Sequence, residues 1–521
     1  MKNVCYNGDI NKKITYFVGG RTMLLEKLLC DVNYKKIINK SSLSLSDIEI
    51  NKVCYNSTNA KAGSVFVCVT GALNDGHKYA NDAYERGCRV FICQDELDLP
   101  DDVVVIITEN SRIALATVSA NFFSRPAEKL TIIGITGTKG KTTTSLLIYN
   151  VLNANGIKAG YIGSNGVDFD GSHFATVNTT PESHDIQDYM SRMVCAGVKA
   201  LVMEVSSQAL LLSRVHGIKF NICVFTNLYP DHIGKYEHPD FDNYKACKHS
   251  LFTDYGASFV VYNADDPHAS EVIAGCGCPS KGISVRTAAD YSASDIEYLR
   301  PDGNIETSFT CHVDGIADGS FPVSLSFPGE FSVYNALTSI AVCRRLGIEY
   351  KDIVSALAVA RIKGRFETIA CPNGAMVVID YAHNGVSLEA ALTALRKYNP
   401  TRLICLFGSV GERTQMRRGE LGLVASRGAD LCIITSDNPD NEPPMNIIGE
   451  ITTYFTADSC PYHAIPDRKE AIEFALKNSE KGDIILLAGK GHETYQLVKG
   501  KREYFSEAEI VYEAFDKIGV K

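Results

Sequence analysis

The sequence lacks any apolar run long enough to cross a membrane. Runs such as Val103 to Ile107 are short, whereas a membrane-spanning helix needs about 20 consecutive apolar residues. The opening residues, MKNVCYNGDINKK, also lack the apolar segment that a signal peptide requires. We therefore expect no membrane insertion and no secretion signal.

Positive charge is also scarce. The chain has 52 Lys and Arg against 61 Asp and Glu, which gives a formal net charge of −9 and a pI near 5.8. A protein whose main partner is nucleic acid or an anionic membrane needs a basic surface. The composition argues against both partners, but phosphorylated small substrates remain compatible because a local cluster can be basic on an acidic protein.

The cysteines form no motif of a metal or redox site. There are 17, scattered along the chain and often inside apolar runs, where a reduced cysteine behaves as a small hydrophobic residue. The one short pair, Cys276 and Cys278, does not have the spacing of a zinc site or a redox dithiol. We expect a reduced, cytoplasmic protein.

The length of 521 residues exceeds what one hydrophobic core supports, so about three domains are expected. With 45% hydrophobic and 22% charged residues, the chain has the composition of a soluble globular protein. Strand-like runs alternate with helix-like runs, which predicts an α/β fold. We place the three α/β domains at residues 1–126, 127–360 and 361–521.

Within this division the expected strands lie at 65–69, 90–93, 103–107, 131–135, 200–205, 221–227, 258–263, 376–380, 402–407, 431–435 and 483–488. Residues 285–327 carry short alternating runs with Asp-Gly turns, which predicts an antiparallel insert. A helical stretch near 335–360 is expected to close the second domain.

A glycine-rich loop is the sharpest local motif. The segment GITGTKGKTTT at 134–144 lies between a strand-like and a helix-like run. Glycines let backbone amides approach phosphate oxygens, and the positive end of the next helix attracts the same anion. Lys141 would neutralise phosphate charge, and the Thr142 hydroxyl would bind Mg²⁺. The strict P-loop pattern requires glycine where Ile135 stands, so a tight turn that carries a lysine is the alternative.

Two other strand-like runs end in residues suited to a metal ion. MEVSS places Glu204 at the end of one run, and FTNLYPDH brings His232 to the end of another. In open α/β sheets, ligands bind at the carboxyl ends of the strands. The pattern predicts that both residues bind a metal beside the phosphates, although either one alone would more often be solvated or structural.

Several motifs in a fixed order resemble the Mur ligases. The central ones are GTKGKTT, MEVSS, FTNL-x-x-DH and Tyr244-x-x-x-Lys248-x-x-Leu-Phe. The stretch around Ser57 is similar to the family's uridine-binding segment. GRFE at 364–367, DYAH at 380–383, SDNP at 436–439 and GKGHETYQ at 489–496 match motifs of its third domain. The resemblance covers nearly the whole chain and is strongest to the tripeptide synthetase, or MurE, type.

The resemblance implies a UDP-binding N-terminal domain, a central P-loop-type domain with a mostly parallel sheet, and a Rossmann-like C-terminal domain that binds an amino acid. It also implies the reaction, a step of peptidoglycan precursor synthesis that uses ATP and Mg²⁺. ATP phosphorylates the terminal carboxylate of UDP-N-acetylmuramoyl-L-alanyl-D-glutamate, and the amine of a diamino acid then displaces phosphate. We expect these small molecules to be the partners and the protein to be a monomer.

The resemblance assigns site residues position by position. The catalytic residues are Lys141, Glu204, His232 and Lys248, and Mg²⁺ is held by Thr142, Glu204, His232 and Lys248 as a carbamate. The ATP contacts are Gly137, Thr138, Lys139, Gly140, Lys141, Thr142, Thr143, Asn335, Arg365, Asp380 and His383. The UDP-substrate contacts are Ser57, Asn178, Thr179, Thr180, Ser206 and Arg214. The amino-acid contacts are Arg418, Asp437, Asn438, Asp440 and Glu493. The sequence alone would favour a surface helix position for Lys248, so its role depends on the resemblance.

A few positions depart from the family pattern. Asn56 and Thr58 replace the charged neighbours of the uridine-site serine, Ser332 replaces an asparagine, Gln208 replaces a histidine, and DYAHNG replaces DYAHTP. These changes bear on the uridine and adenine contacts and leave the phosphate and metal positions intact.

The identity of the added amino acid depends on Asp440. The resemblance implies that diaminopimelate enzymes carry an arginine after Asn-Pro, which binds the second carboxylate of the substrate. Here Asp440 follows, and Glu442 comes two residues later. A carboxylate there would repel diaminopimelate, so we predict L-lysine, with ornithine compatible and meso-diaminopimelate as the alternative. A solvent-facing Asp440 in a polar turn would leave this choice to another residue.

Two other functions compete with this hypothesis. A paralogous folylpolyglutamate-type ligase would share the activation chemistry but has no use for a UDP-sugar segment. A nucleotide-binding regulator that has lost catalysis would not need Lys141, Thr142, Glu204, His232 and Lys248, all of which are present. Phosphate release from ATP with and without substrates separates the two classes.

Overall fold

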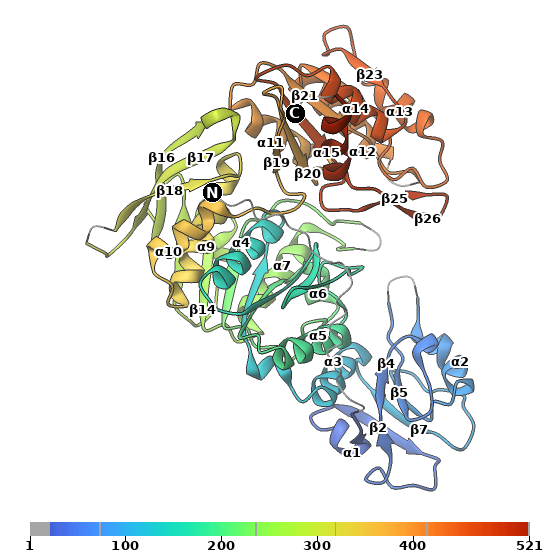
Figure 1. Ribbon diagram of the computed structural model, residues 1–521. Coiled ribbons are helices and arrows are strands. Elements are labelled where there is room, and N and C mark those ends of the chain that lie inside the picture. The colour runs from blue at the N-terminus through green and yellow to red at the C-terminus, as the bar shows by residue number, and fades with distance from the viewer. Residues whose placement is uncertain (1–20, 72–73, 235–236, 318, 413–414, 519–521) are drawn as a thin grey trace. The chain divides into compact units, whose positions relative to one another are not determined.

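The computed structural model describes residues 21–71, 74–234, 237–317, 319–412 and 415–518. The chain divides into two compact units, Met1–Ser280 and Lys281–Lys521 (Figure 1). Among the described residues, no helix combines the length and the apolarity that a bilayer crossing requires. The cysteines in the same part of the chain are all free thiols.

The N-terminal part of the first unit is built on a five-stranded sheet in the order β2-β7-β6-β5-β4. β4 (Lys52–Cys54), β5 (Ser64–Val67), β6 (Val90–Cys93) and β7 (Val104–Thr108) are parallel, and β2 (Tyr34–Asn39) is antiparallel to β7. All residues of β5, β6 and β7 are buried, which explains why the strands are continuous apolar runs. The helices are α1 (Leu25–Leu28), α2 (Ala80–Glu85) and α3 (Ser111–Phe122), and a small ladder joins β1 (Met23–Leu24) to β3 (Glu49–Ile50).

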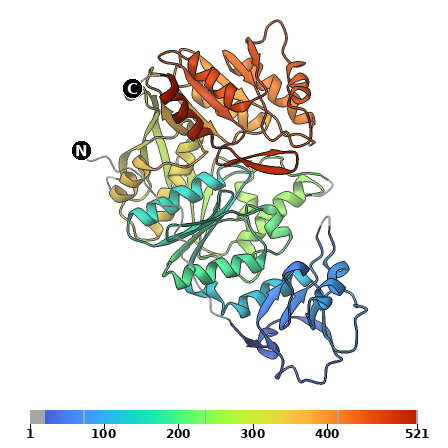
Figure 2. The same cartoon turned by 45° about the vertical axis from the view of Figure 1, so that its right-hand side comes forward.

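The rest of the first unit contains a mostly parallel sheet in the order β11-β10-β9-β12-β8-β13-β14. Its strands are β8 (Thr131–Thr136), β9 (Ala159–Gly163), β10 (Gly166–Phe169), β11 (Ser172–Phe174), β12 (Ala200–Glu204), β13 (Ile222–Phe225) and β14 (Phe259–Asn263). α4 (Lys141–Ala154) and α5 (Ser183–Cys195) cover opposite faces of this sheet (Figure 2). α6 (Ser207–Leu211), α7 (Phe241–Thr253) and α8 (Ala269–Val272) complete the unit. The antiparallel meander of β9, β10 and β11 was not predicted.

The second unit begins with an antiparallel ladder. β16 (Tyr291–Leu299), β17 (Glu306–Val313) and β18 (Ser320–Leu325) follow β15 (Ser280–Ser284) and confirm the predicted antiparallel insert. The expected single helical stretch near 335–360 is instead two helices, α9 (Glu330–Arg345) and α10 (Tyr350–Val359). The break has a local cause, because Gly347 has a φ of 91°, a left-handed conformation that ends the first helix.

The C-terminal part of the second unit has a six-stranded sheet in the order β19-β20-β24-β21-β22-β23. β20 (Met376–Asp380), β24 (Ile484–Ala488), β21 (Leu403–Phe407), β22 (Leu431–Ile434) and β23 (Tyr462–Ala464) are parallel, and β19 (Glu367–Ala370) is antiparallel. The helices are α11 (Gly385–Arg396), α12 (Gln415–Gly428), α13 (Pro444–Thr452), α14 (Arg468–Lys477) and α15 (Glu507–Ile518). A hairpin of β25 (Tyr495–Val498) and β26 (Lys501–Tyr504) follows β24.

The predicted α/β class with mostly parallel sheets is confirmed, and most predicted strands agree with the structure to within two residues. The predicted helix KTTTSLLIYNVLNA is α4 in full. The domain limits at 126 and 360 stay a prediction, because the structure divides the chain once, at Ser280.

A buried ion pair joins α14 to α15 in the C-terminal sheet domain. Arg468 and Glu507 are 1% and 2% exposed, and Nε and Nη2 of Arg468 donate to Glu507 Oε1 at 2.9 and 2.8 Å. Arg468 also donates to the carbonyls of Ser436 and Ala488. Ser436 begins the SDNP segment and Ala488 ends β24, so the pair fixes both strand ends.

We expect Glu507→Gln to destabilise this domain by about 3–5 kcal/mol, because it leaves a buried guanidinium without its counter-charge. Amide hydrogen exchange in β24 measures the local free energy of opening. The control is Glu513→Gln on the same helix, which removes the exposed pair with Lys469 and should leave the protection unchanged. Equal loss in both variants would contradict a special role for the buried pair.

Candidate active site

Three neighbouring strands bring three of the four predicted catalytic residues, Lys141, Glu204 and His232, to one edge of the central sheet. Glu204, the last residue of β12, is paired in register with Ile135 of β8, and Phe225 of β13 with Thr136. The carboxyl ends of the three strands are therefore aligned at the same edge of the sheet. The chain order also reverses at β8, since β9 and β12 lie on one side of it and β13 and β14 on the other. Ligands of open α/β sheets bind at such a reversal.

The loop after β8 is held in a shape that only glycine permits at two positions. Gly137 and Gly140 have φ angles of 147° and 82°, and a side chain at 137 would overlap the Thr226 hydroxyl. Asn227 fixes the loop from the next strand, because its carbonyl and its Oδ1 accept the N–H groups of Thr138 and Lys139 at 2.9 and 2.8 Å.

The loop and α4 together have the features that suit an anion. Lys141 Nζ donates to the carbonyls of Gly137 and Thr138 at 2.8 and 3.0 Å, which holds the ammonium over the loop. No side chain caps the N-terminus of α4, so its first-turn amides face the loop mouth. An ammonium and a helix N-terminus at one point suit the phosphates of a nucleotide.

Glu204 and Thr142 fit a divalent cation. Glu204 is completely buried, and its carboxylate accepts hydrogen bonds from the Thr142 hydroxyl at 3.0 Å, the Tyr161 hydroxyl at 2.6 Å and Ser164 N at 2.9 Å. A buried carboxylate beside a hydroxyl and next to a phosphate loop is a donor set of the kind that Mg²⁺ prefers.

His232 lies on the loop after β13, in a left-handed conformation with φ 57°. Its Nδ1 is 2.9 Å from Glu237 Oε1, so Nε2 is the nitrogen that would bind a metal. The side chain is half exposed.

Lys248 is buried in α7, not on the surface that the sequence alone would favour. It is 1% exposed, and its Nζ donates to the Gly137 carbonyl at 2.9 Å, the same oxygen that accepts from Lys141. Burial, with the charge of Lys141 as a second cause, holds the pKa of the Lys248 ammonium well below its usual range. A neutral amine is the form that can react with carbon dioxide to give a carbamate.

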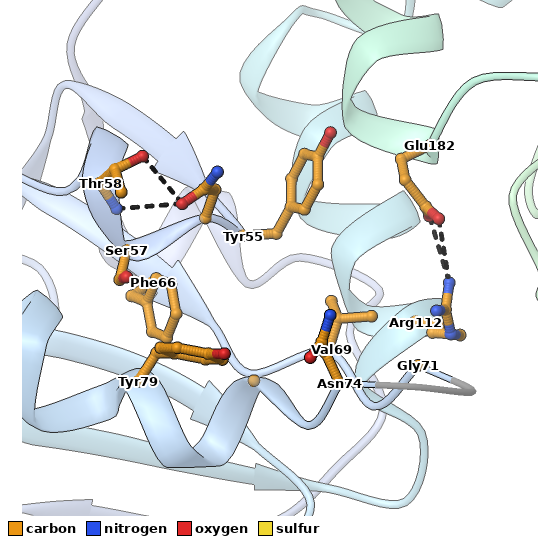
Figure 3. Close-up of a pocket in the computed structure, with 12 residues that line it drawn as sticks. Tyr55, Ser57, Thr58, Phe66, Val69, Gly71, Asn74, Tyr79, Arg112 and Glu182 are labelled. Atoms are coloured by element: carbon orange, nitrogen blue, oxygen red, sulfur yellow. Dashed lines mark hydrogen bonds and ion pairs between the residues drawn. The ribbon is translucent and has the colours of Figure 1, made fainter. Parts of the chain in front are cut away.

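A cavity of about 510 Å³ lies around Ser57 and reaches to Arg112 and Glu182 (Figure 3). Figure 3 shows Phe66 and Tyr79 beside Ser57 at one end of the cavity and the Arg112–Glu182 pair at the other. A cavity of this volume with aromatic walls and a cation suits a nucleotide.

Most of the predicted UDP-substrate residues beyond the cavity contact one another or their neighbours. Glu182 pairs with Arg112 at 3.2 Å and with Arg214 at 3.0 Å, and Arg214 also donates to the Thr180 carbonyl at 3.0 Å. The Thr180 hydroxyl accepts from Ser206 N at 3.1 Å. Thr179 contacts the Ser164 hydroxyl at 3.0 Å, and Asn178 is exposed.

Three of the four predicted nucleotide residues in the second unit meet around Tyr381. The Arg365 guanidinium lies 4.9 Å from the Tyr381 ring, and the His383 ring lies 4.7 Å from it. Asp380 ends β20 and accepts from Phe366 N at 3.0 Å. Burial raises the pKa of Asp380 to about 6, and the Arg365 charge opposes this shift. Asn335 is buried in α9.

The predicted amino-acid residues form a cluster at the ends of β22 and β24. Asn438 Nδ2 donates to Glu493 Oε2 at 3.1 Å. Lys490, completely buried, donates to Asn438 Oδ1 and Glu493 Oε2, each at 3.1 Å. Asp437 Oδ1 lies 3.5 Å from the same ammonium.

Arg418 and Asp440 are engaged within the protein. Arg418 is buried and donates to Glu442 at 2.8 and 2.6 Å and to Glu450 at 2.8 Å. The Asp440 carboxylate accepts from Gly500 N at 2.7 Å and so holds the turn of the β25–β26 hairpin. The roles of both residues in amino-acid binding stay predictions.

Several residues at these sites were missed by the sequence analysis. Tyr161 and Ser164 hold Glu204, Arg112 and Glu182 line the cavity, and Lys490 organises the amino-acid cluster. Lys490 stands inside GKGHETYQ, so the motif gave a signal for it. The other four carry no local motif.

Known proteins show the same organisation. Residues 49–133, 135–343 and 364–491 match families described as "Mur ligase family, catalytic domain", "Mur ligase middle domain" and "Mur ligase, glutamate ligase domain". A UDP-N-acetylmuramoyl-L-alanyl-D-glutamate–2,6-diaminopimelate ligase of Caldanaerobacter subterraneus is 39% identical over 90% of this chain and 95% of its own. The Clostridium perfringens enzyme of the same name is 35% identical over 95% and 100%.

Solved structures agree with this. A UDP-N-acetylmuramoyl-L-alanyl-D-glutamate–2,6-diaminopimelate ligase superposes with a TM-score of 0.67 at 25% identity, over 92% of this chain and 97% of the other. MurF of Thermotoga maritima in complex with ADP, 19% identical with a TM-score of 0.57, covers 89% of this chain and 97% of its own, and shares the fold. Since relatives of more than 30% identity align over nearly all of both chains, the protein belongs to the Mur ligase family of ATP-dependent, ADP-forming amide ligases.

Proposed function

We propose that the enzyme joins the amine of 2,6-diaminopimelate to the D-glutamyl carboxylate of UDP-N-acetylmuramoyl-L-alanyl-D-glutamate. The observation that carries this proposal is that Lys141, Glu204 and Lys248 lie around one phosphate loop. The relatives of the chain are named as ligases of 2,6-diaminopimelate. A folylpolyglutamate-type ligase is less well supported, because the cavity at Ser57 suits a uridine nucleotide.

The chemistry follows from the weak electrophilicity of a carboxylate. A carboxylate oxygen attacks the γ-phosphorus of ATP, the bond to ADP breaks, and an acyl phosphate forms. The amine then attacks the acyl carbon, phosphate departs and the nitrogen loses a proton. Both reactants of the first step are anionic, so the Lys141 ammonium offsets their repulsion. It also stabilises the negative charge of the phosphoryl group during the transfer.

The residues of the central sheet edge fit Mg²⁺. Thr142 and Glu204 would hold one ion, and His232 with the Lys248 carbamate a second. Mg²⁺ supplies positive charge to the phosphate oxygens. A carbamate on Lys248 would place a negative charge beside the Lys141 ammonium at the Gly137 carbonyl, and the two groups would attract each other.

The remaining site residues hold the substrates. Ser57 and the Thr180–Ser206–Arg214 network would bind the UDP-muramoyl peptide, together with Asn178 and Thr179. Thr138, Lys139, Gly140 and Thr143 lie on or next to the phosphate loop. Asn335, Arg365, Asp380 and His383 stay predicted nucleotide contacts. Availability of ATP and of the UDP-linked precursor supports a cytoplasmic location.

The choice of 2,6-diaminopimelate over L-lysine follows the names of the relatives. L-lysine, our prediction from the sequence, remains a second candidate because Asp440 stands where the diaminopimelate enzymes are expected to carry an arginine. The structure weakens that argument, since the Asp440 carboxylate is committed to the hairpin turn through Gly500 N.

Lys141→Ala should lower turnover by about 10²–10³-fold or more, because it removes the charge that stabilises the transferred phosphoryl group. Phosphate release with all three substrates measures the effect. Lys199→Ala, at an exposed position, is the control and should keep normal activity. Near-normal turnover in Lys141→Ala would contradict the assignment of residues 134–144 as the phosphate-binding loop.

Lys248→Ala should lose most activity, and a short carboxylic acid should restore part of it by standing in for the carbamate. The matched control is Lys245→Ala on the same helix, where the lysine pairs with Glu271 at the surface. Labelled bicarbonate with carbon-13 NMR gives a direct readout of the carbamate in the native enzyme. A native enzyme without a carbamate signal, at a pH where carbamates persist, would contradict the proposal.

Competition between 2,6-diaminopimelate and L-lysine tests the amino acid. We expect the native enzyme to prefer 2,6-diaminopimelate. If residue 440 faces the distal carboxylate, Asp440→Arg should raise this preference about tenfold or more, because a charge reversal at such a contact is worth about 1.4 kcal/mol or more. Asp458→Arg makes the same charge change at an exposed site and should leave the ratio unmoved. A native preference for L-lysine would reverse the proposal, and an unmoved ratio in Asp440→Arg would show that Asp440 does not face the substrate.

A further inference from the structure

Lys490 is a buried cation in the centre of the predicted amino-acid site. Its ammonium lies 3.1 Å from Asn438 Oδ1, 3.1 Å from Glu493 Oε2 and 3.5 Å from Asp437 Oδ1. It therefore contacts three of the five side chains predicted to bind the amino acid. A buried ammonium persists only with such partners, because an unpaired charge in the interior is strongly unfavourable.

The charges in this cluster do not cancel. Asp437 and Glu493 carry two negative charges and Lys490 one positive charge, so one negative charge remains. Asp437 Oδ1 is also buried and accepts no hydrogen bond within the described part of the chain. A buried oxygen of this kind requires a donor, and the ammonium group of an amino acid would supply both the hydrogen bond and the missing charge.

Lys490 also sets the orientation of its neighbours. Asn438 Oδ1 accepts from Lys490 and from Leu497 N, the latter at 2.9 Å, so the amide nitrogen faces Glu493 at 3.1 Å. The rings of Tyr495 and Phe505 lie 5.6 and 6.0 Å from the ammonium and limit its movement. The direction of the Glu493 carboxylate thus depends on Lys490.

We propose that Lys490 is a positioning residue that determines specificity for the amino acid, an inference that rests on the proposed function. Glu493, one of the predicted amino-acid contacts, would hold the distal amine, and in diaminopimelate the carbon of that amine also bears a carboxylate. Lys490 cancels one carboxylate charge of the cluster and so lets the pocket accept this second carboxylate. Without Lys490, two negative charges would repel diaminopimelate and favour lysine, which ends in an ammonium alone. On this account the cation for diaminopimelate is Lys490, and no arginine at position 440 is needed.

The test is a competition assay that gives the ratio of kcat/KM for 2,6-diaminopimelate to that for L-lysine. Lys490→Met removes the charge and keeps the length of the side chain, and we expect the ratio to fall at least tenfold. The KM values for ATP and for the UDP-muramoyl dipeptide should stay within about twofold. Lys490→Arg, which keeps the charge, should retain the native ratio. Lys469→Met removes an exposed lysine paired with Glu513 and is the matched control.

A second pair of variants tests the charge balance itself. Lys490→Met combined with Glu493→Gln restores one net negative charge, so the ratio should return toward the native value. Should Lys490→Met fail to fold, Glu493→Gln alone should move the ratio toward diaminopimelate. A ratio that stays within twofold of the native value, with both substrates weakened alike, would overturn the inference and leave the proposed function standing. A native enzyme that uses neither amino acid would overturn both.

Discussion

The register of β12, β8 and β13 is the constraint on which the central site depends. Because Glu204 stands opposite Ile135 and Phe225 opposite Thr136, the loops that follow these strands start at one level. A slip of one residue would turn Glu204 to the other face of the sheet. Every residue of β12 and β13 is buried, so such a slip would also exchange side chains of different shapes within a closely packed core. The hydrophobic core thereby sets the position of the carboxylate as firmly as its hydrogen bonds do.

Two sites of the protein contain charge that is incompletely balanced. Lys141 and Lys248 share one carbonyl oxygen, while Asp437 and Glu493 share one lysine. Such arrangements oppose folding, because buried charge is unfavourable unless it is paired. They become favourable when a ligand of the opposite charge arrives. The first excess is positive and suits phosphate, and the second is negative and suits an amine.

The sequence was sufficient to predict those features that depend on local pattern. The helix α4, the loop before it and the strands ending at Glu204 and Asp380 follow from glycine spacing and apolar runs. The antiparallel meander of β9, β10 and β11 was missed, because its glycines at 160, 163, 166 and 171 interrupt the alternation of apolar and polar residues. Contacts between distant residues were also missed. Arg112 and Glu182 are 70 positions apart, and Lys490 and Asn438 are 52 apart. The burial of Lys248 had no local signal, since Tyr-x-x-x-Lys is also compatible with a surface helix.

The triad of Arg112, Glu182 and Arg214 carries one net positive charge at the end of the cavity opposite Ser57. The protein as a whole carries a formal charge of −9, so an anion is repelled at long range and attracted only near this triad. Salt screens the long-range repulsion more than a contact among half-buried groups. Moderate ionic strength should therefore raise the association rate of a doubly charged diphosphate more than it weakens the bound complex. The net charge of the protein thus affects the association rate of the ligand, while the triad affects how slowly the ligand dissociates.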